Sequence, residues 1–222
     1  IVANTQPPAA TPSISYVGKG TVWSTTSNTT SYTINRPSGV QNGDLMLATV
    51  SVSDPVVHTV TAPSGWTIVR NITESDSFAA LKFVVLKRTA GSSEPASWSG
   101  TFGSTVKPVM TQVVAYRGAD TAANQFVVEN TSQSGSGNSI TTATVNNTDS
   151  RSWRVEFFAA SNDYSTYWNW TSETTERADN SAEYWASYSS YRTITVSVAD
   201  SAGPIGTGNT NRSATLNRSY FA

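Results

Sequence analysis

The chain has 222 residues, of which 37% are hydrophobic and only 13% are charged, and this is long enough for one large all-β domain or two domains of about 100 residues. Its net charge is −1, with basic and acidic residues spread along the chain, so no basic surface for nucleic acid is expected. The absence of cysteine excludes a disulfide scaffold, a thiolate nucleophile and a cysteine zinc site.

Hydroxyl and amide side chains, rather than charged ones, make this chain polar. Ser and Thr together account for about three residues in ten, and only four residues are lysines. Surfaces of this kind are common on secreted and virion proteins. No segment has the apolar length of a membrane span, and the first residues, IVANTQPPAATP, lack the features of a signal peptide. We therefore expect a location on a virion or at the cell surface, reached after removal of a leader or by cell lysis.

The N-terminal residues 1–12 are rich in proline and cannot build a strand ladder, which predicts an arm or a linker. Residues 13–23 alternate around a Gly-Lys-Gly interruption, which predicts a strand with a bulge, and 31–35 predict another strand. The longest apolar run, GDLMLATVSV at 43–52, follows an Asn-Gly turn. We expect this run to form the buried central strand of the fold.

Further strands are predicted at 56–62, 66–72 and 106–116. The segment 78–89 also has helical spacing, but its compact FVVL core and its β neighbours favour a strand. Residues 98–102, WSGTF, are interrupted by glycine and are expected to form a loop.

The sequence is internally duplicated with an offset of about 107 residues. This offset places RSWRVEFFAAS, at 151–161, over the central strand, and 185–195 over the strand at 78–89. We predict an all-β, antiparallel β-sandwich, jelly-roll-like, built from two related halves. The expected organisation is a single domain at 13–222 with a pseudo-repeat at about 13–120 and 121–222. Two tandem sandwiches are the alternative.

Catalytic motifs are not evident in the sequence. His58 is the only histidine, and it lies in a predicted strand with no Ser or Cys nucleophile motif around it. The carboxylate pairs Glu74 with Asp76 and Glu173 with Glu176 each lie within one predicted loop, which does not place two carboxyls across a sugar. We predict that the chain has no catalytic residue and is not an enzyme.

Metal and cofactor motifs are equally sparse. Asp54, Asp120, Asp163 and Asp179 fall in predicted loops and could hold calcium, but no EF-hand-like run accompanies them. We predict no metal site and no cofactor, with calcium as the alternative.

The most informative cluster is aromatic. Two short stretches, YSTYWNW and YWASYSSY, concentrate tyrosine and tryptophan well above the 10% average of the chain. Adjacent aromatic residues in a strand point to opposite faces of a sheet, so one set can be core while the other faces solvent. Planar rings at a surface can stack on a sugar or a protein partner, whereas cross-strand packing inside the sandwich is the alternative. The candidate ligand platform consists of Tyr164, Tyr167, Trp168, Trp170, Tyr184, Trp185, Tyr188 and Tyr191.

Four motifs together resemble a β-sandwich module of bacteriophage structural and tail proteins and of large bacterial surface proteins. They are GVQNGDLMLA at 39–48, APSGWT at 62–67, VAYRGAD at 114–120 and TERAD at 175–179. The resemblance covers the chain from about residue 13 to the end and implies a β-sandwich fold without shared catalytic residues. It also implies that Gly65 is a turn residue and that Trp66 is a core ring.

The expected function is that of a non-enzymatic structural or binding domain exposed on a phage virion, in a tail, fibre or capsid decoration protein. The expected partners are other virion or surface-assembly subunits, including copies of the same chain, and a host-surface glycan. A carbohydrate-binding or adhesion module of a bacterial surface protein is the alternative. A polysaccharide lyase or hydrolase on a jelly roll is disfavoured by the single histidine and the scattered carboxylates.

Overall fold

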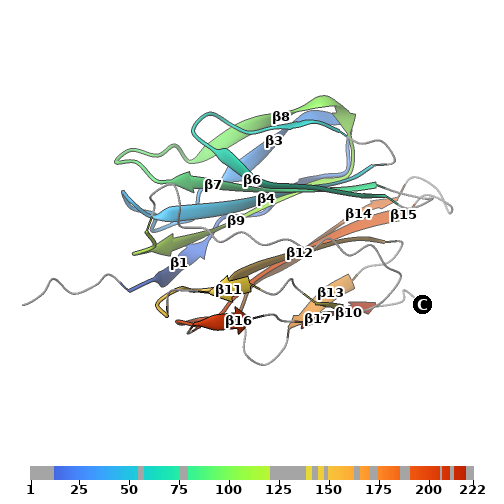
Figure 1. The fold of residues 1–222 in the computed structure, drawn as a ribbon. Helices are drawn as coiled ribbons and strands as arrows, with labels where there is room; N and C mark the ends of the chain where they lie inside the picture. Colours follow the sequence, from blue (N-terminus) through green and yellow to red (C-terminus); the bar gives the residue numbers. More distant parts are fainter. Residues whose placement is uncertain are drawn as a thin grey trace, which may run out of the picture.

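The computed structural model describes residues 13–54, 58–75, 80–120, 139–141, 145–147, 150–162, 166–170, 175–185, 191–205, 207–210 and 213–218. Within these residues the chain forms seventeen strands and no helix. The strands build antiparallel sheets that pack face to face, which confirms the predicted all-β sandwich fold. The sheets are stacked in four layers, two from each half of the chain (Figure 1).

The first half supplies the upper two layers in Figure 1. Its outer sheet has the order β3-β8-β5 and consists of β3 (Thr29–Asn35), β5 (Val60–Thr61) and β8 (Ser97–Val106). Its inner sheet has the order β1-β9-β4-β7-β6, with β2 also paired to β9. The strands of the inner sheet are β1 (Ser15–Lys19), β2 (Trp23–Thr25), β4 (Leu45–Asp54), β6 (Thr67–Ser75), β7 (Ala80–Thr89) and β9 (Val109–Arg117).

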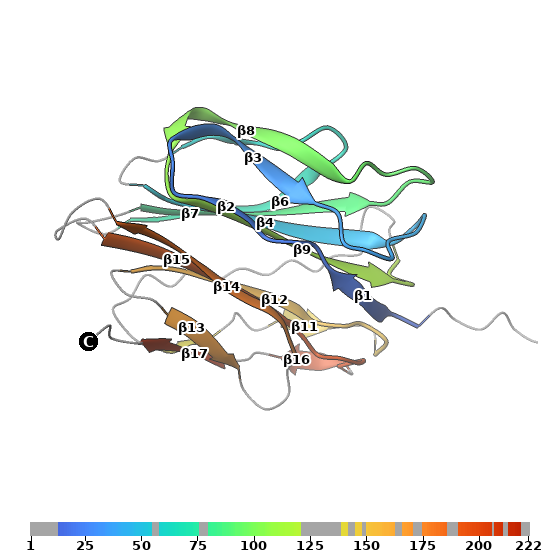
Figure 2. The same ribbon diagram turned by 180° about the vertical axis from the view of Figure 1, so that it is seen from behind.

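The second half supplies the lower two layers, and the view from behind shows the same order (Figure 2). Its inner sheet has the order β12-β15-β14 and consists of β12 (Val155–Asn162), β14 (Thr175–Trp185) and β15 (Tyr191–Asp200). Its outer layer has the sheet β10-β17-β13 and the pair β11-β16. These strands are β10 (Ser139–Thr141), β11 (Val145–Asn147), β13 (Thr166–Trp170), β16 (Gly208–Thr210) and β17 (Ser213–Arg218).

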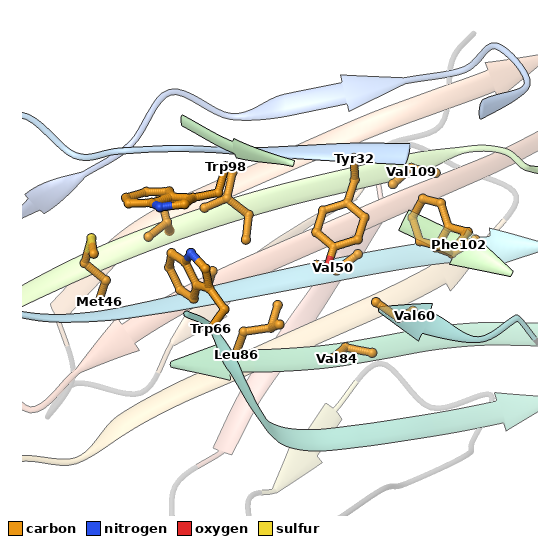
Figure 3. Close-up of a cluster of buried hydrophobic side chains, with 14 of the residues drawn as sticks. Tyr32, Met46, Val50, Val60, Trp66, Val84, Leu86, Trp98, Phe102 and Val109 are labelled. Atoms are coloured by element: carbon orange, nitrogen blue, oxygen red, sulfur yellow. The ribbon is translucent and has the colours of Figure 1, made fainter. Parts of the chain in front are cut away.

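The main hydrophobic core lies between the two sheets of the first half (Figure 3). Trp66 and Trp98 meet edge to face, with their ring centres 5.2 Å apart, and Tyr32 packs against Phe102 at the same distance. Aliphatic side chains from β4, β7 and β9 fill the space between these rings. They are Met46, Ala48, Val50, Val52, Val84, Leu86, Val109, Val113 and Ala115.

Strand β4 is buried on both of its faces. Its even-numbered residues contribute to the core of the first half, whereas Leu45 and Leu47 on the other face pack against the second half. Every residue from Leu45 to Ser53 is buried, as is every residue of β9 before Arg117. A strand that is apolar on both faces must be covered on both sides, and here the second half provides the second cover.

The two halves share one strand order. In the first half β4, β7 and β6 are neighbours, and in the second half β12, β15 and β14 follow the same sequence of pairings. A β-bulge lies between Ile68 and Arg70 of β6 and between Glu176 and Ala178 of β14. Bulges are specific structural features rather than defects, so a shared bulge position supports the internal duplication.

Equivalent faces of the two halves meet at their interface. The hydroxyls of Ser53 in β4 and Ser161 in β12 are in hydrogen-bond contact, and these residues are 108 residues apart in the sequence. The same spacing relates Leu47 to Val155, and both side chains pack in the same interface cluster. Because the same surface is used on both sides, the halves are related by an approximate twofold rotation.

Strand β8 corrects the expectation that residues 98–102 form a loop. It is a strand in which Trp98 and Phe102 face the core, while Ser97 and Ser99 are exposed. Gly100 breaks the sequence pattern for a packing reason, because the ring of Tyr32 on the paired strand β3 occupies the space beside its Cα. Glycine inside a strand can mark such a close approach rather than a turn.

The packing of Tyr32 over Gly100 gives a stability prediction. A Cβ at residue 100 would overlap the Tyr32 ring, so Gly100→Ala should lower the free energy of unfolding by about 1–3 kcal/mol. The matched control is Gly103→Ala in the same strand, where the nearest atom to a new Cβ is 3.4 Å away, and its effect should stay below about 1 kcal/mol. Urea unfolding monitored by tryptophan fluorescence measures both, and equal effects would contradict the assignment.

Candidate functional site

The predicted aromatic platform is distributed over three strands of the second half. Tyr167, Trp168 and Trp170 lie in β13, and Tyr191 is the first residue of β15. Tyr184 and Trp185 end β14, and Trp185 is paired with Tyr191 across the ladder. Tyr164 and Tyr188 lie outside the described residues.

The arrangement of these strands differs in one respect from the sequence expectation. The second stretch, YWASYSSY, was expected to lie within a single strand, but its two ends belong to the paired strands β14 and β15. Strand β13 belongs to another sheet, where it pairs with β17, and it lies against β14 and β15. The fold therefore brings the two aromatic stretches to neighbouring strands, and their role as a ligand platform stays a prediction.

A buried carboxylate joins the two halves. Asp200, at the end of β15, is fully buried and accepts hydrogen bonds from Arg177 Nε at 2.7 Å and from a terminal guanidinium nitrogen at 2.9 Å. Its Oδ2 also accepts a hydrogen bond from the Tyr116 hydroxyl at 2.9 Å, and the backbone N–H of Ala202 donates to Oδ1 at 2.8 Å. Because Tyr116 belongs to the first half and Asp200 to the second, this carboxylate links the halves directly.

Aromatic rings surround this carboxylate and complete what we term the Asp200 cluster: Tyr16, Tyr116, Trp153, Arg177 and Asp200. The guanidinium of Arg177 lies 4.3 Å from the centre of the Tyr16 ring, a cation–π contact. Tyr16 meets Tyr116 edge to face at 5.8 Å, and Tyr116 meets Trp153 at 6.3 Å. Arg177 is the bulged residue of β14, and the bulge is the local feature that takes it out of the regular ladder register.

Tyrosine ionisation is disfavoured in this cluster. Burial raises the pKa of Tyr116, and the negative charge of Asp200 and its hydrogen bond raise it further, against the opposing charge of Arg177. Burial likewise raises the pKa of Tyr16, with Arg177 lowering it and Asp200 raising it. These hydroxyls therefore stay protonated as donors and packing groups, which fits a structural link rather than an acid–base pair.

A second polar cluster lies at one end of the first sandwich. His58 Nδ1 is 2.7 Å from the hydroxyl oxygen of Ser104, and His58 Nε2 is 3.2 Å from Oδ1 of Asp54. His58 is 5% exposed and is therefore buried. Sequence reasoning missed its serine partner, which comes from a segment that was expected to follow a loop.

The turn residues of three of the four sequence motifs have backbone and packing roles. Gly39, Gly43, Gly65 and Gly118 all have positive φ values, between 74° and 86°, which glycine adopts without strain. Trp66 is a buried member of the main core.

An ion pair between the half-exposed Arg117 and the buried Asp44 connects two of these motifs. The guanidinium of Arg117 donates to both oxygens of Asp44, at 3.0 and 2.8 Å, and also to the carbonyl of Gly39 at 2.9 Å. This bidentate pair fixes the turn before β4 against the end of β9.

The three described aspartates considered for calcium lie on different elements. Asp54 is beside His58, Asp120 follows β9 and Asp179 lies in β14, whereas Asp163 is outside the described residues. No group of three or more histidine, aspartate or glutamate side chains with metal-binding geometry occurs in the described part of the chain.

Comparison with protein-family models, with curated proteins and with solved structures finds no match to this chain. The described residues include no helix long and apolar enough to cross a membrane.

The raised tyrosine pKa values predict a loss of stability at alkaline pH. The pKa of an unfolded tyrosine is about 10, whereas burial raises the pKa of both Tyr116 and Tyr32 above this value in the fold. Above pH 10 the unfolded chain releases protons that the folded chain retains, so the free energy of unfolding falls by up to about 1.4 kcal/mol per pH unit for each such tyrosine.

Tyr116→Phe removes one of these ionisable hydroxyl groups and therefore tests the predicted pH dependence of the free energy of unfolding. Urea titrations between pH 9 and 11 should show a shallower decline for Tyr116→Phe than for the wild type. At pH 7, where the Tyr116 hydroxyl is protonated in both the folded and the unfolded chain, the variant should lose about 1.5–3 kcal/mol for the missing hydrogen bond to the Asp200 carboxylate. Parallel declines above pH 10 would show that Tyr116 ionises normally in the fold.

Proposed function

We propose that this chain is a structural and binding domain exposed on the surface of a phage virion, in a tail, fibre or capsid decoration protein. The observation that supports it best is the four-layer stack, in which the inner sheet of the first half is buried on both faces. Such a stack holds two outer sheets at a fixed separation, as a building block of an assembly requires. The resemblance of the four motifs to phage structural modules points in the same direction.

The outward face of β8 supports a binding role on polar surfaces. Its exposed positions are occupied by hydroxyl side chains and glycine, whereas the inward positions carry Trp98, Phe102 and Val106. Hydroxyl groups form neutral hydrogen bonds without the desolvation cost of charges. This face is suited to a neutral, polar partner.

Self-assembly is the first experimental test. We expect light scattering on a size-exclusion column to show oligomers of the 1–222 chain at neutral pH and a smaller species for a 13–222 variant, because the Pro-rich arm would dock on a neighbouring copy. A stable interface should bury well over about 1,000 Å² in total, so dissociation should be concentration-dependent in the micromolar range or below. Monomers of both lengths at all concentrations would contradict assembly through the arm.

A carbohydrate-binding or adhesion module is the second candidate, and the convergence of β13, β14 and β15 favours it. If the aromatic residues on these strands stack on a sugar, Trp168→Ala and Trp185→Ala should each weaken glycan binding about tenfold or more. Trp168→Phe and Trp185→Phe keep an aromatic face and are the matched controls. A glycan array followed by tryptophan fluorescence titration measures binding, and equal affinities for the alanine variants would exclude these rings from the site.

A further inference from the structure

Strand pairing places His58 opposite Ser104. In the ladder between β5 and β8, Val60 is paired with Phe102, and the N–H of Gly103 donates to the carbonyl of Thr59 at 3.0 Å. Continuing this antiparallel register by two residues brings His58 to Ser104 on the same face of the sheet. The observed distance of 2.7 Å between His58 Nδ1 and Ser104 Oγ agrees with this register.

Asp54 approaches the other side of the imidazole ring. It is the last residue of β4 in the neighbouring layer, in line with Val50 and Val52, which face the core. Its Oδ1 lies 3.2 Å from His58 Nε2. This contact has the distance of an ion pair but lacks the alignment of a hydrogen bond. In the tautomer with hydrogen on Nε2, which faces this carboxylate, the lone pair of Nδ1 accepts a hydrogen bond from the Ser104 hydroxyl.

In a nucleophilic site the base and the carboxylate are shielded from water while the nucleophile is exposed, and the three side chains here follow this pattern. The side chain of His58 is 4% exposed and that of Asp54 is 16% exposed, whereas Ser104 is exposed to solvent. Burial limits the contact of the base and the carboxylate with water, while the exposed Ser104 hydroxyl remains accessible to a substrate.

The ladder between β3 and β8 is irregular at the same place. The pairing of β3 with β8 shifts between Thr29 opposite Val106 and Ser31 opposite Thr101, so Ser104 falls within the shifted stretch. Bulges often lie beside active sites, where they redirect a side chain out of the regular pleat. The backbone N–H groups of Ser104 and Thr105 lie in this stretch, the position from which donors to an oxyanion formed at Ser104 would come.

We propose that Asp54, His58 and Ser104 form an acyl-transfer site that takes small esters. The hydroxyl oxygen of Ser104 attacks the ester carbonyl carbon, its proton passes to His58 Nδ1, and the bond to the leaving alcohol breaks as His58 returns the proton to that alcohol. Water then attacks the acyl-serine, giving the carboxylic acid and free Ser104. This activity departs from the sequence expectation of a non-enzymatic chain and is independent of the proposed assembly and binding roles.

Covalent labelling of the full chain tests the proposal. The chain is incubated with diisopropyl fluorophosphate, and the modified residue and its rate of modification are determined by intact mass and peptide mapping. We expect one modification, at Ser104, at least tenfold faster than in His58→Gln or Asp54→Asn, and none at this position in Ser104→Ala. Ser99→Ala, an exposed serine on the same strand, is the matched control and should label like the wild type.

Turnover of p-nitrophenyl acetate provides the second readout. The wild type should show release of p-nitrophenol that Ser104→Ala lowers at least tenfold and Ser99→Ala leaves unchanged. The proposal fails if Ser104 is labelled no faster than Ser99, or if Ser104 is labelled equally fast in Asp54→Asn. The three residues would then only stabilise the end of the sandwich. Should His58→Gln not fold, the comparison of Ser104 with Ser99 within the wild-type chain decides the question.

Discussion

The burial of the inner sheet of the first half on both faces is the constraint on which the rest of the fold depends. Strand β4 contributes Met46 and Val50 to one core and Leu45 and Leu47 to another, and β9 does the same with Val113 and Val114. A sheet with apolar side chains on both faces cannot remain exposed on one of them. The first half therefore needs the second half as a cover, and the two halves pack against each other instead of forming two separate domains joined by a linker.

The Asp200 cluster makes this stacking specific. Apolar contact alone would tolerate sliding of one sheet over the other, whereas Tyr116 must reach the Asp200 carboxylate and Tyr16 must cover the Arg177 guanidinium across the interface. Arg177 and Asp200 belong to the same half and would move together, so sliding would remove the Tyr116 hydrogen bond from a buried carboxylate, and this loss favours one docking geometry. The hydroxyl contact between Ser53 and Ser161 marks where equivalent strands meet.

Local pattern was sufficient to predict much of this architecture. The apolar run of β4 and the strand character of β7 are both properties of neighbouring residues in the sequence. Strand β8 was misread because Gly100 signals a break locally, although it is there to admit the Tyr32 ring from β3. The contact of His58 with Ser104 was not predictable either, because it depends on the register of two strands that are 46 residues apart. Contacts across a ladder follow from the fold and not from spacing.

The two halves differ at a pair of interior positions, where the second half has charged side chains and the first half has apolar ones. At the spacing of 108 residues, Arg154 and Glu156 correspond to Met46 and Ala48, and they form a buried ion pair with Nε and Oε1 3.1 Å apart. Buried ion pairs contribute less to stability than apolar side chains of similar volume, because desolvation offsets their attraction. At these two positions the interior of the second half therefore gains less than that of the first half, and β15 packs against β4 and β9.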